Sequence, residues 1–193
     1  MGGIYGVFVC LTYPGLGKPA DAELAQGKLA ANLALKYQVR HLIYSSSELA
    51  PESKDNPAKM MIEAHVKELG AQHDEFKWTI LRPAFFYENF DGLLGSVSEC
   101  LFESSMDKGT KIQMVGGEDI GRVAGAVFEA GQEYHGATIT VCGDCLTSKE
   151  VNAVHKKVMG RPLTRIPGFV GSVLRGSSFR SWSRCRAADA SQG

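Results

Sequence analysis

The segment "VRHLIYSSS" (Val39–Ser47) decides the fold class, because it has the pattern of a β-strand buried on both faces and ends in three serines. Residues 20–37 precede it and are dominated by alanine, leucine and lysine, which predicts a helix. A second helix is predicted after it, starting at Pro57 behind a capping Asn56 and closed by Gly70. The strand therefore lies between two helices, and such alternation of helices and strands suggests βαβ units and a parallel sheet.

The same alternation continues on both sides of this unit. Further helices are expected within 88–105, around 120–128 and from a Thr-x-x-Glu capping box at 147–150 to Gly160. Further strands are expected at 4–12, an apolar run of the kind buried on both faces of a parallel sheet, and at 77–83, 111–116 and 137–142. The pattern predicts an α/β fold with a parallel sheet and helices on both faces, whose ligands bind at the carboxyl ends of the strands.

Charge and cysteine content narrow the class of protein. Lys plus Arg and Asp plus Glu are 21 each, so no overall field attracts nucleic acid or an anionic membrane. The first apolar run is far too short to span a bilayer, and five scattered cysteines argue against a disulfide framework. Cys142 and Cys145 have redox or metal spacing, but no second pair completes a zinc site, so we expect incidental thiols. A soluble intracellular protein is predicted.

The loop "YPGLGK" (Tyr13–Lys18) follows the first strand and precedes a helix, which is the order of a phosphate-binding loop. Its spacing is neither GxxxxGK[ST] nor GxGxxG. We therefore expect Gly15 and Gly17 to turn the chain rather than to hold a phosphate.

Two lysines are candidates for a role at the strand ends. Lys28 lies on an otherwise apolar helical stripe, so it either lays its stem along the sheet or reaches a phosphate or ribose. Lys59 lies near a helix N-terminus, where it opposes the helix dipole. Reductases that place Ser and Lys beside a nicotinamide also use a tyrosine four residues before the lysine as proton donor, and here that position is Asp55.

The segment "LRPAFFYENF" (Leu81–Phe90) is an unusual strand exit, with a proline followed by aromatic residues and Asn89. It could be an aromatic plug at the end of the sheet. It could equally form the wall of a nicotinamide pocket.

Five segments carry a family resemblance in this order: "QGKLAANLALKYQVRHLIYSS", "AKMMIEAHVKELG", "TILRPAFFYENF", "DIGRVAGAVF" and "GATITVCGDCLTSKEVNAVHKKVMGRPL". Together they resemble the NmrA-like family, atypical relatives of the short-chain dehydrogenases/reductases. The resemblance implies a Rossmann fold that binds NADP or NAD. Members include redox-sensing regulators without catalytic activity and some quinone or alcohol reductases.

The resemblance also implies a set of cofactor contacts at matching motif positions. These are Thr12, Tyr13, Pro14, Lys28, Lys59, Phe86, Tyr87, Glu88 and Asn89. Lys59 would be catalytic only in an enzyme, and Asp55 in the tyrosine position fits the non-catalytic members.

The chain departs from the family pattern at both ends. That pattern begins with a strand, a GxxGxxG loop and a helix, whose amides hold the pyrophosphate, and nothing like it precedes Met1. The expected fold is thus an incomplete Rossmann-like sheet with a partial C-terminal substrate-side region, in which dinucleotide binding is weakened or lost. Residues 1–165 would form this partial NAD(P)-binding domain, and residues 166–193 a basic, disordered tail.

The leading hypothesis is a truncated NmrA-like, NAD(P)-binding protein with a redox-sensing, regulatory role. Its partners would be proteins rather than nucleic acid or membrane, in the cytoplasm or also the nucleus. An NAD(P)H-dependent oxidoreductase acting on a quinone or related carbonyl is the alternative, and a cofactor-free protein-interaction remnant is the second. Missing strands would leave an open sheet edge and allow self-association.

Overall fold

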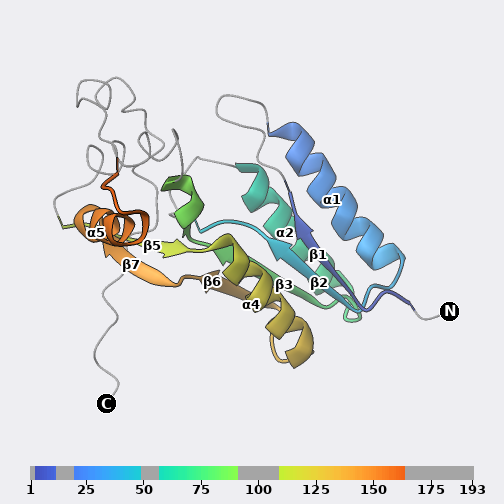
Figure 1. The fold of residues 1–193 in the computed structure, drawn as a ribbon. Helices are drawn as coiled ribbons and strands as arrows, with labels where there is room; N and C mark the ends of the chain where they lie inside the picture. The colour runs from blue at the N-terminus through green and yellow to red at the C-terminus, as the bar shows by residue number, and fades with distance from the viewer. Residues whose placement is uncertain (1–2, 12–19, 49–56, 91–108, 164–193) are drawn as a thin grey trace, which may run out of the picture. The chain divides into compact units, whose positions relative to one another are not determined.

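The computed structural model describes residues 3–11, 20–48, 57–90 and 109–163. The fold is α/β, as predicted, with a parallel sheet of four strands flanked by helices (Figure 1). The chain divides into two compact units. The first comprises Met1–Glu48, Lys54–Pro83 and Glu118–Val141, and the second Leu49–Ser53, Ala84–Gly117 and Cys142–Gly193.

The first unit is built on the parallel sheet, with strand order β1-β2-β3-β6. Its strands are β1 (Gly6–Cys10), β2 (His41–Ser45), β3 (Trp78–Pro83) and β6 (Ala137–Val141). The helices are α1 (Asp21–Lys36), α2 (Pro57–Gln72) and α4 (Gly117–Ala130), whose first residue is assigned to the second unit. All of these elements were predicted from the hydrophobic pattern.

Alternation along the strands explains why helices cover both faces of this sheet. Leu42, Tyr44 and Ile80 pack in one cluster with residues of α1 and α2. On the opposite face, the ring of Phe128 from α4 lies edge-on to His41. Because successive residues of a strand point to opposite faces, His41 and Leu42 serve different helical layers.

Two details of the first unit differ from the sequence prediction. Strand β1 was expected to be buried on both faces, but only Val9 is buried, because β1 is the edge strand of this sheet. Helix α2 was expected to close at Gly70, yet it continues to Gln72. A Cβ at Gly70 would lie 2.1 Å from Nε1 of Trp78, so this glycine makes room for the indole rather than ending the helix.

The second unit contains a smaller sheet with strand order β4-β5-β7. Strand β4 (Phe85–Phe86) is parallel to β5 (Lys111–Val115), and β5 is antiparallel to β7 (Asp144–Thr147). The 3-10 helix η1 (Tyr87–Phe90) follows β4, and α5 (Ser148–Met159) follows β7. Only β5 and α5 were predicted; most of the helix expected within 88–105 lies outside the described residues.

Helix α5 begins and ends as its sequence predicts. Thr147 and Glu150 form the complete capping box, each side chain bonding to the other's backbone N–H. Gly160 ends the helix in the left-handed conformation, with φ 71°. The core of this unit comprises Phe85, Phe90, Ile112, Met114, Val151 and Leu163.

Candidate functional site

The carboxyl ends of the parallel strands form the candidate site of the first unit. Strand register places Cys10, Ser45 and Leu81 in line, and Pro83 beside Val141. The residue after β2, Ser46, still pairs with β3, because its N–H donates to the Leu81 carbonyl at 2.8 Å. The serines that follow β2 therefore lie at the rim where α/β proteins bind ligands.

Lys59 is held beside this rim by a carboxylate that the sequence did not indicate. Its Nζ lies 3.0 Å from Oε1 of Glu23, and the two side chains are 11% and 0% exposed. Within the described residues neither Glu23 oxygen accepts a hydrogen bond, and the ammonium of Lys59 compensates the buried negative charge. The ammonium predicted to face a cofactor is thus part of a buried ion pair.

A glycine allows this ion pair to form. A Cβ at Gly27 of α1 would lie 2.4 Å from Cδ1 of Ile62 on α2, so the two helices approach too closely for any larger residue. Glu23 lies one turn before Gly27, and Lys59 lies about one turn before Ile62. Close packing at the glycine therefore brings the two charged side chains together.

The Lys59 ammonium lies 5.9 Å from the centroid of the Tyr44 ring. The Tyr44 hydroxyl is buried and has no hydrogen-bond partner among the described residues. Burial, followed by the charges of Glu23 and Glu63, raises the pKa of the Tyr44 phenol far above its usual value. Tyr44 therefore cannot replace the missing tyrosine as an accessible proton donor.

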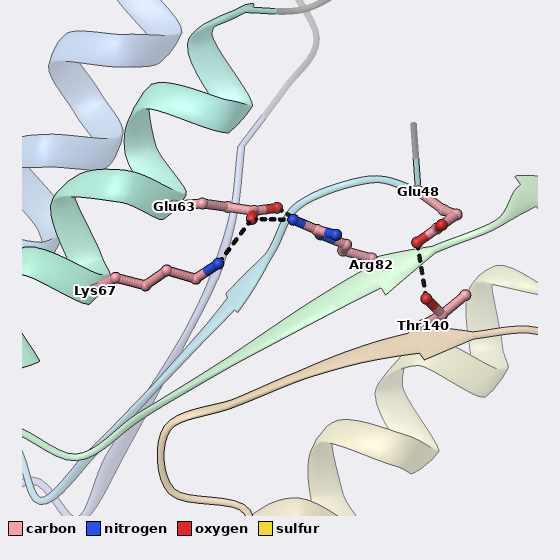
Figure 2. A network of polar contacts seen from close by, with 5 residues as sticks. All are labelled: Glu48, Glu63, Lys67, Arg82 and Thr140. Carbon is pink, nitrogen blue, oxygen red and sulfur yellow. Dashed lines mark hydrogen bonds and ion pairs between the residues drawn. The ribbon is translucent and has the colours of Figure 1, made fainter. Parts of the chain in front are cut away.

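A second charged cluster joins α2 to the end of β3 (Figure 2). Arg82 donates through Nε and a terminal nitrogen to the two oxygens of Glu63, at 3.0 and 2.7 Å, and Lys67 adds an ion pair at 3.7 Å. Burial opposes ionisation of Glu63, but hydrogen bonds from Arg82 and Ser46 outweigh it and keep the pKa of this carboxyl below its usual value. The same fork raises the pKa of Arg82.

Glu48 and Thr140 form the neighbouring contact (Figure 2). The Thr140 hydroxyl donates to Oε2 of Glu48 at 2.8 Å, and Thr140 is the register partner of Arg82 on the adjacent strand. Carboxylates and cations balance one another across this rim. Such a cluster fixes the strand ends in place and leaves little free charge for chemistry.

The exit segment after β3 belongs to the second unit. Tyr87 donates its hydroxyl to Asp144, and Oε1 of Glu88 accepts from the Gly117 N–H at 2.7 Å, at the start of α4. Phe85 and Phe90 are buried, with edge-to-face rings whose centroids are 5.4 Å apart. These two phenylalanines lie in the hydrophobic core of the second unit.

The predicted cofactor contacts are distributed as follows. Thr12, Tyr13 and Pro14 lie outside the described residues, as does Asp55. Lys28 and Lys59 lie on the neighbouring helices α1 and α2 of the first unit, and Phe86–Asn89 are consecutive in the second. Lys59, Tyr87 and Glu88 are engaged with protein groups. Contact of Lys28, Phe86 and Asn89 with a dinucleotide stays a prediction, with Lys28 in the first unit and Phe86 and Asn89 in the second.

Sequence reasoning missed several polar residues that organise the rim. They are Glu23, Glu48, Glu63, Arg82 and Thr140. A signal existed for one of them, because Glu63 lies between the buried Ile62 and Val66 and one turn after Lys59. A carboxylate so close to an apolar stripe requires a basic partner.

Two kinds of feature are absent from the described part of the chain. It contains no group of three or more His, Cys, Asp or Glu placed to hold a metal ion. None of its helices combines the length and the apolar character needed to cross a bilayer. Cys142 is an exposed free thiol that donates to the Asp144 carbonyl at 3.1 Å.

Comparison with known proteins gives one family match and several structural neighbours. The pattern of the NmrA-like family matches residues 1–175. No curated protein matches the chain.

The structural neighbours are distant in sequence. "NmrA, a negative transcriptional regulator in complex with NAD" has a TM-score of 0.60 and 21% identity, over 77% of this chain and 50% of that one. UDP-N-acetylglucosamine 4-epimerase from Bacillus cereus has a TM-score of 0.62 and 15% identity, over 80% and 62%. MoeE5 in complex with UDP-glucose and NAD has a TM-score of 0.59 and 16% identity, over 84% and 65%. The chain thus spans between half and two thirds of these structures.

Proposed function

Because the chain belongs to the NmrA-like family, we propose that it is an NAD(P)-binding regulatory protein that responds to the redox state of its cofactor and catalyses no hydride transfer. The single observation that carries this proposal is the buried ion pair between Lys59 and Glu23. A catalytic lysine of the reductase type must face the nicotinamide and its proton donor. Here the ammonium is neutralised within the protein.

Cofactor binding is supported by the fold and by the polar rim of the parallel sheet. Two of the three structural neighbours named above are described as complexes with NAD. Lys28 is half-buried on α1 and has no ion pair among the described residues, so its ammonium is available for a phosphate. The proposal covers NAD and NADP alike.

The alternative function is an NAD(P)H-dependent oxidoreductase that reduces a quinone or a related carbonyl. One observation favours it, namely that Lys59 lies near a tyrosine ring, that of Tyr44. The raised pKa and complete burial of the Tyr44 hydroxyl argue against proton donation from it. The regulatory function is therefore preferred.

Dinucleotide binding tests the first part of the proposal. NADH and NADPH would be titrated against the chain by nicotinamide fluorescence, and NAD⁺ and NADP⁺ by calorimetry. Lys28→Ala should weaken binding by about tenfold or more, because it removes a charge-assisted hydrogen bond to phosphate. Lys157→Ala, an exposed lysine on α5, is the matched control and should bind as the wild type does. No binding of any of the four nucleotides would instead support a cofactor-free interaction protein.

Turnover tests the second part. NADPH consumption would be followed with a soluble quinone, and the wild-type chain should be silent. The informative variant is Glu23→Gln combined with Lys59→Met, which removes both charges without leaving one of them buried alone. Consumption by the wild type that this double variant abolishes would establish the reductase and overturn the regulatory proposal.

The regulatory role requires a protein partner whose affinity depends on cofactor state. Hydrogen exchange of the chain with the oxidised and the reduced cofactor would locate the responsive surface. A difference confined to the rim of the first-unit sheet would support a sensor. Identical exchange with both forms would contradict redox sensing. A cytoplasmic site of action, with the nucleus as an alternative, is part of the proposal.

A further inference from the structure

Two buried polar groups of the first unit have hydrogen-bonding capacity that the described residues do not use. One is the carboxylate of Glu23 on α1, whose side chain is fully buried and whose two oxygens accept no hydrogen bond there. The other is the hydroxyl of Tyr44 on β2, which is buried and has no partner there either. Buried polar groups without hydrogen bonds are rare and costly, so this pair of groups requires an explanation.

The two groups are chemically complementary and lie near the same ammonium. Nζ of Lys59 is 3.0 Å from Oε1 of Glu23 and 5.9 Å from the centroid of the Tyr44 ring. Burial, and after it the charge of Glu23, raises the pKa of the Tyr44 phenol, so the carboxylate acts on the phenol electrostatically. A phenol donates a hydrogen bond and a carboxylate accepts one. Tyr44 is therefore a suitable replacement for Lys59 as the partner of Glu23.

Lys59 is the member of the ion pair that is placed to leave it. Lys59 lies in the first turn of α2 and Glu23 in the first turn of α1, and these two helices pack side by side (Figure 1). The helix dipole favours a carboxylate at this position and opposes an ammonium. The Lys59 side chain is 11% exposed, whereas that of Glu23 is not exposed at all. The flexible stem of a lysine also allows its ammonium to move while the backbone stays in place.

We propose that Glu23 is an intramolecular competitor for the ammonium of Lys59, and that Tyr44 replaces Lys59 when a bound dinucleotide draws the lysine to the rim of the sheet. In the closed arrangement, seen in the structure, Lys59 pairs with Glu23. In the open arrangement Lys59 contacts the cofactor and the Tyr44 hydroxyl donates to Glu23, so the buried carboxylate keeps a partner. The inference rests on the cofactor binding proposed above. It supplies no proton donor for hydride transfer, because the Tyr44 hydroxyl is then bound to Glu23.

Stability measurements without cofactor test whether Tyr44 can replace Lys59. In the wild type, Tyr44→Phe removes a hydroxyl that has no partner among the described residues, so the urea midpoint should stay the same or rise. In the Lys59→Met background Glu23 has lost its cation, and the same change should lower the midpoint, because it removes the replacement donor. The same effect of Tyr44→Phe in both backgrounds would overturn the proposal.

A spectroscopic measurement decides the question if Lys59→Met does not fold. Isotope-labelled tyrosine observed by NMR at Cζ reports the hydrogen bond of the hydroxyl, and Tyr44→Phe assigns the signal. Saturating NADPH should shift the Tyr44 signal in the wild type and cause no comparable shift in Glu23→Gln, which lacks the carboxylate. A wild-type signal that stays unchanged at saturation would contradict the exchange of partners.

Affinity tests the competition for the ammonium. Glu23→Gln removes the competitor, so it should bind NADPH at least about tenfold more tightly than the wild type. Glu118→Gln, which breaks the exposed ion pair with Arg122, is the matched control and should bind as the wild type does. Equal affinity of Glu23→Gln and the wild type would overturn the competition. Binding by neither chain would instead overturn the proposed cofactor function, and the urea measurements would still show whether Tyr44 replaces Lys59.

Discussion

Lys59 shows how one residue can change meaning between sequence and structure. From its position alone it was a candidate to contact a nicotinamide. In the structure it forms an ion pair with Glu23, whose side chain is fully buried. Taking two charges out of water costs several kcal/mol for each ion, and the mutual attraction offsets this only while both are present. The pair should therefore behave as a unit in stability measurements.

Removing one member of the pair should cost far more than removing both. Lys59→Met leaves the Glu23 carboxylate buried without a cationic partner, and we expect a loss of about 3 kcal/mol in the free energy of unfolding. Combining it with Glu23→Gln should bring stability within about 1 kcal/mol of the wild type. Urea unfolding followed by circular dichroism measures both.

The exposed pair of Arg122 and Glu118 provides the control for this cycle. Its side chains are 68% and 79% exposed. Arg122→Met should therefore change the free energy of unfolding by less than about 0.5 kcal/mol. Additive effects of Lys59→Met and Glu23→Gln would show that the buried pair is not coupled.

Two histidines of the first unit are held in their neutral forms. Thr79 donates its hydroxyl to the Tyr134 carbonyl at 2.7 Å, so Nε2 of the buried His41, 2.9 Å away, must donate to Thr79. Nδ1 of His135 accepts from the Trp78 N–H at 3.3 Å. Burial and the charge of His135 lower the pKa of His41, and burial and Lys77 lower that of His135.

Acid should therefore destabilise the first unit before its carboxylates titrate. The pKa of both histidines is 6.5 in the unfolded chain and lower in the folded chain. As pH falls through 6.5, the unfolded chain therefore binds protons at these histidines before the folded chain does. Stability is thus greatest above that pH and falls below it, until the lowered pKa values of the folded state are passed. Urea midpoints between about pH 7.5 and about pH 5.5 should drop, and His41→Gln should reduce the drop. An equal drop in His41→Gln would mean that other groups govern it.

At the scale of elements, close packing between α1 and α2 depends on Gly27. Replacing a helical glycine by alanine normally stabilises a helix by up to about 1 kcal/mol. At Gly27 the added Cβ would meet three side-chain carbons of Ile62 at 2.4–3.0 Å. Overpacking of this kind costs about 1–3 kcal/mol, so the steric term should win.

Gly27→Ala should therefore lower the thermal midpoint, although it raises helix propensity. The matched control is Gly121→Ala on α4, where a Cβ would meet nothing within 4 Å. That variant should be stabilised by about 0.5–1 kcal/mol. Differential scanning calorimetry measures the thermal midpoints of both variants. A higher midpoint for Gly27→Ala would contradict the prediction, because it would mean that α1 and α2 can move apart without loss of stability.

The elements predicted correctly are those whose pattern is local. The apolar stripes of α2 and α4 and the capping box at Thr147 depend on residues within a turn or two, so they are readable without tertiary structure. Strands β4 and β7 are short, and β7 pairs with a strand far away in the chain, so no periodic signal marks them. The contact of Lys59 with Glu23 also joins residues far apart in the sequence, on two different helices, so no local pattern marks it.

The candidate site was harder to predict than the fold. Motif positions identified Lys28, Lys59 and the exit segment, but motifs carry no information on which side chains pair with one another. Glu23 resembled an ordinary acidic residue in the first turn of a helix, where the dipole favours it. Its burial follows only from the approach of α2, which three-dimensional packing determines.

At the scale of the whole molecule, the two units have separate hydrophobic cores. One cluster comprises side chains of α1, α2 and strands of the parallel sheet, and the other those of β4, β5, α5 and η1. Ile80 and Met114 lie one in each unit, and both are fully buried. Truncating either to alanine removes about 2–5 kcal/mol of local stability.

We expect each truncation to act within its own unit. Met114→Ala should accelerate amide exchange in β5 and β7 while β2 and β3 keep their protection, and Ile80→Ala should do the reverse. Hydrogen exchange read by mass spectrometry resolves these strands, and Val158→Ala, at an exposed position on α5, controls for general effects of substitution. Equal acceleration in both sheets with either variant would show that the units unfold as one cooperative structure. A regulator that responds to a ligand in one unit requires the first result, because the second unit can then stay folded while the first one changes.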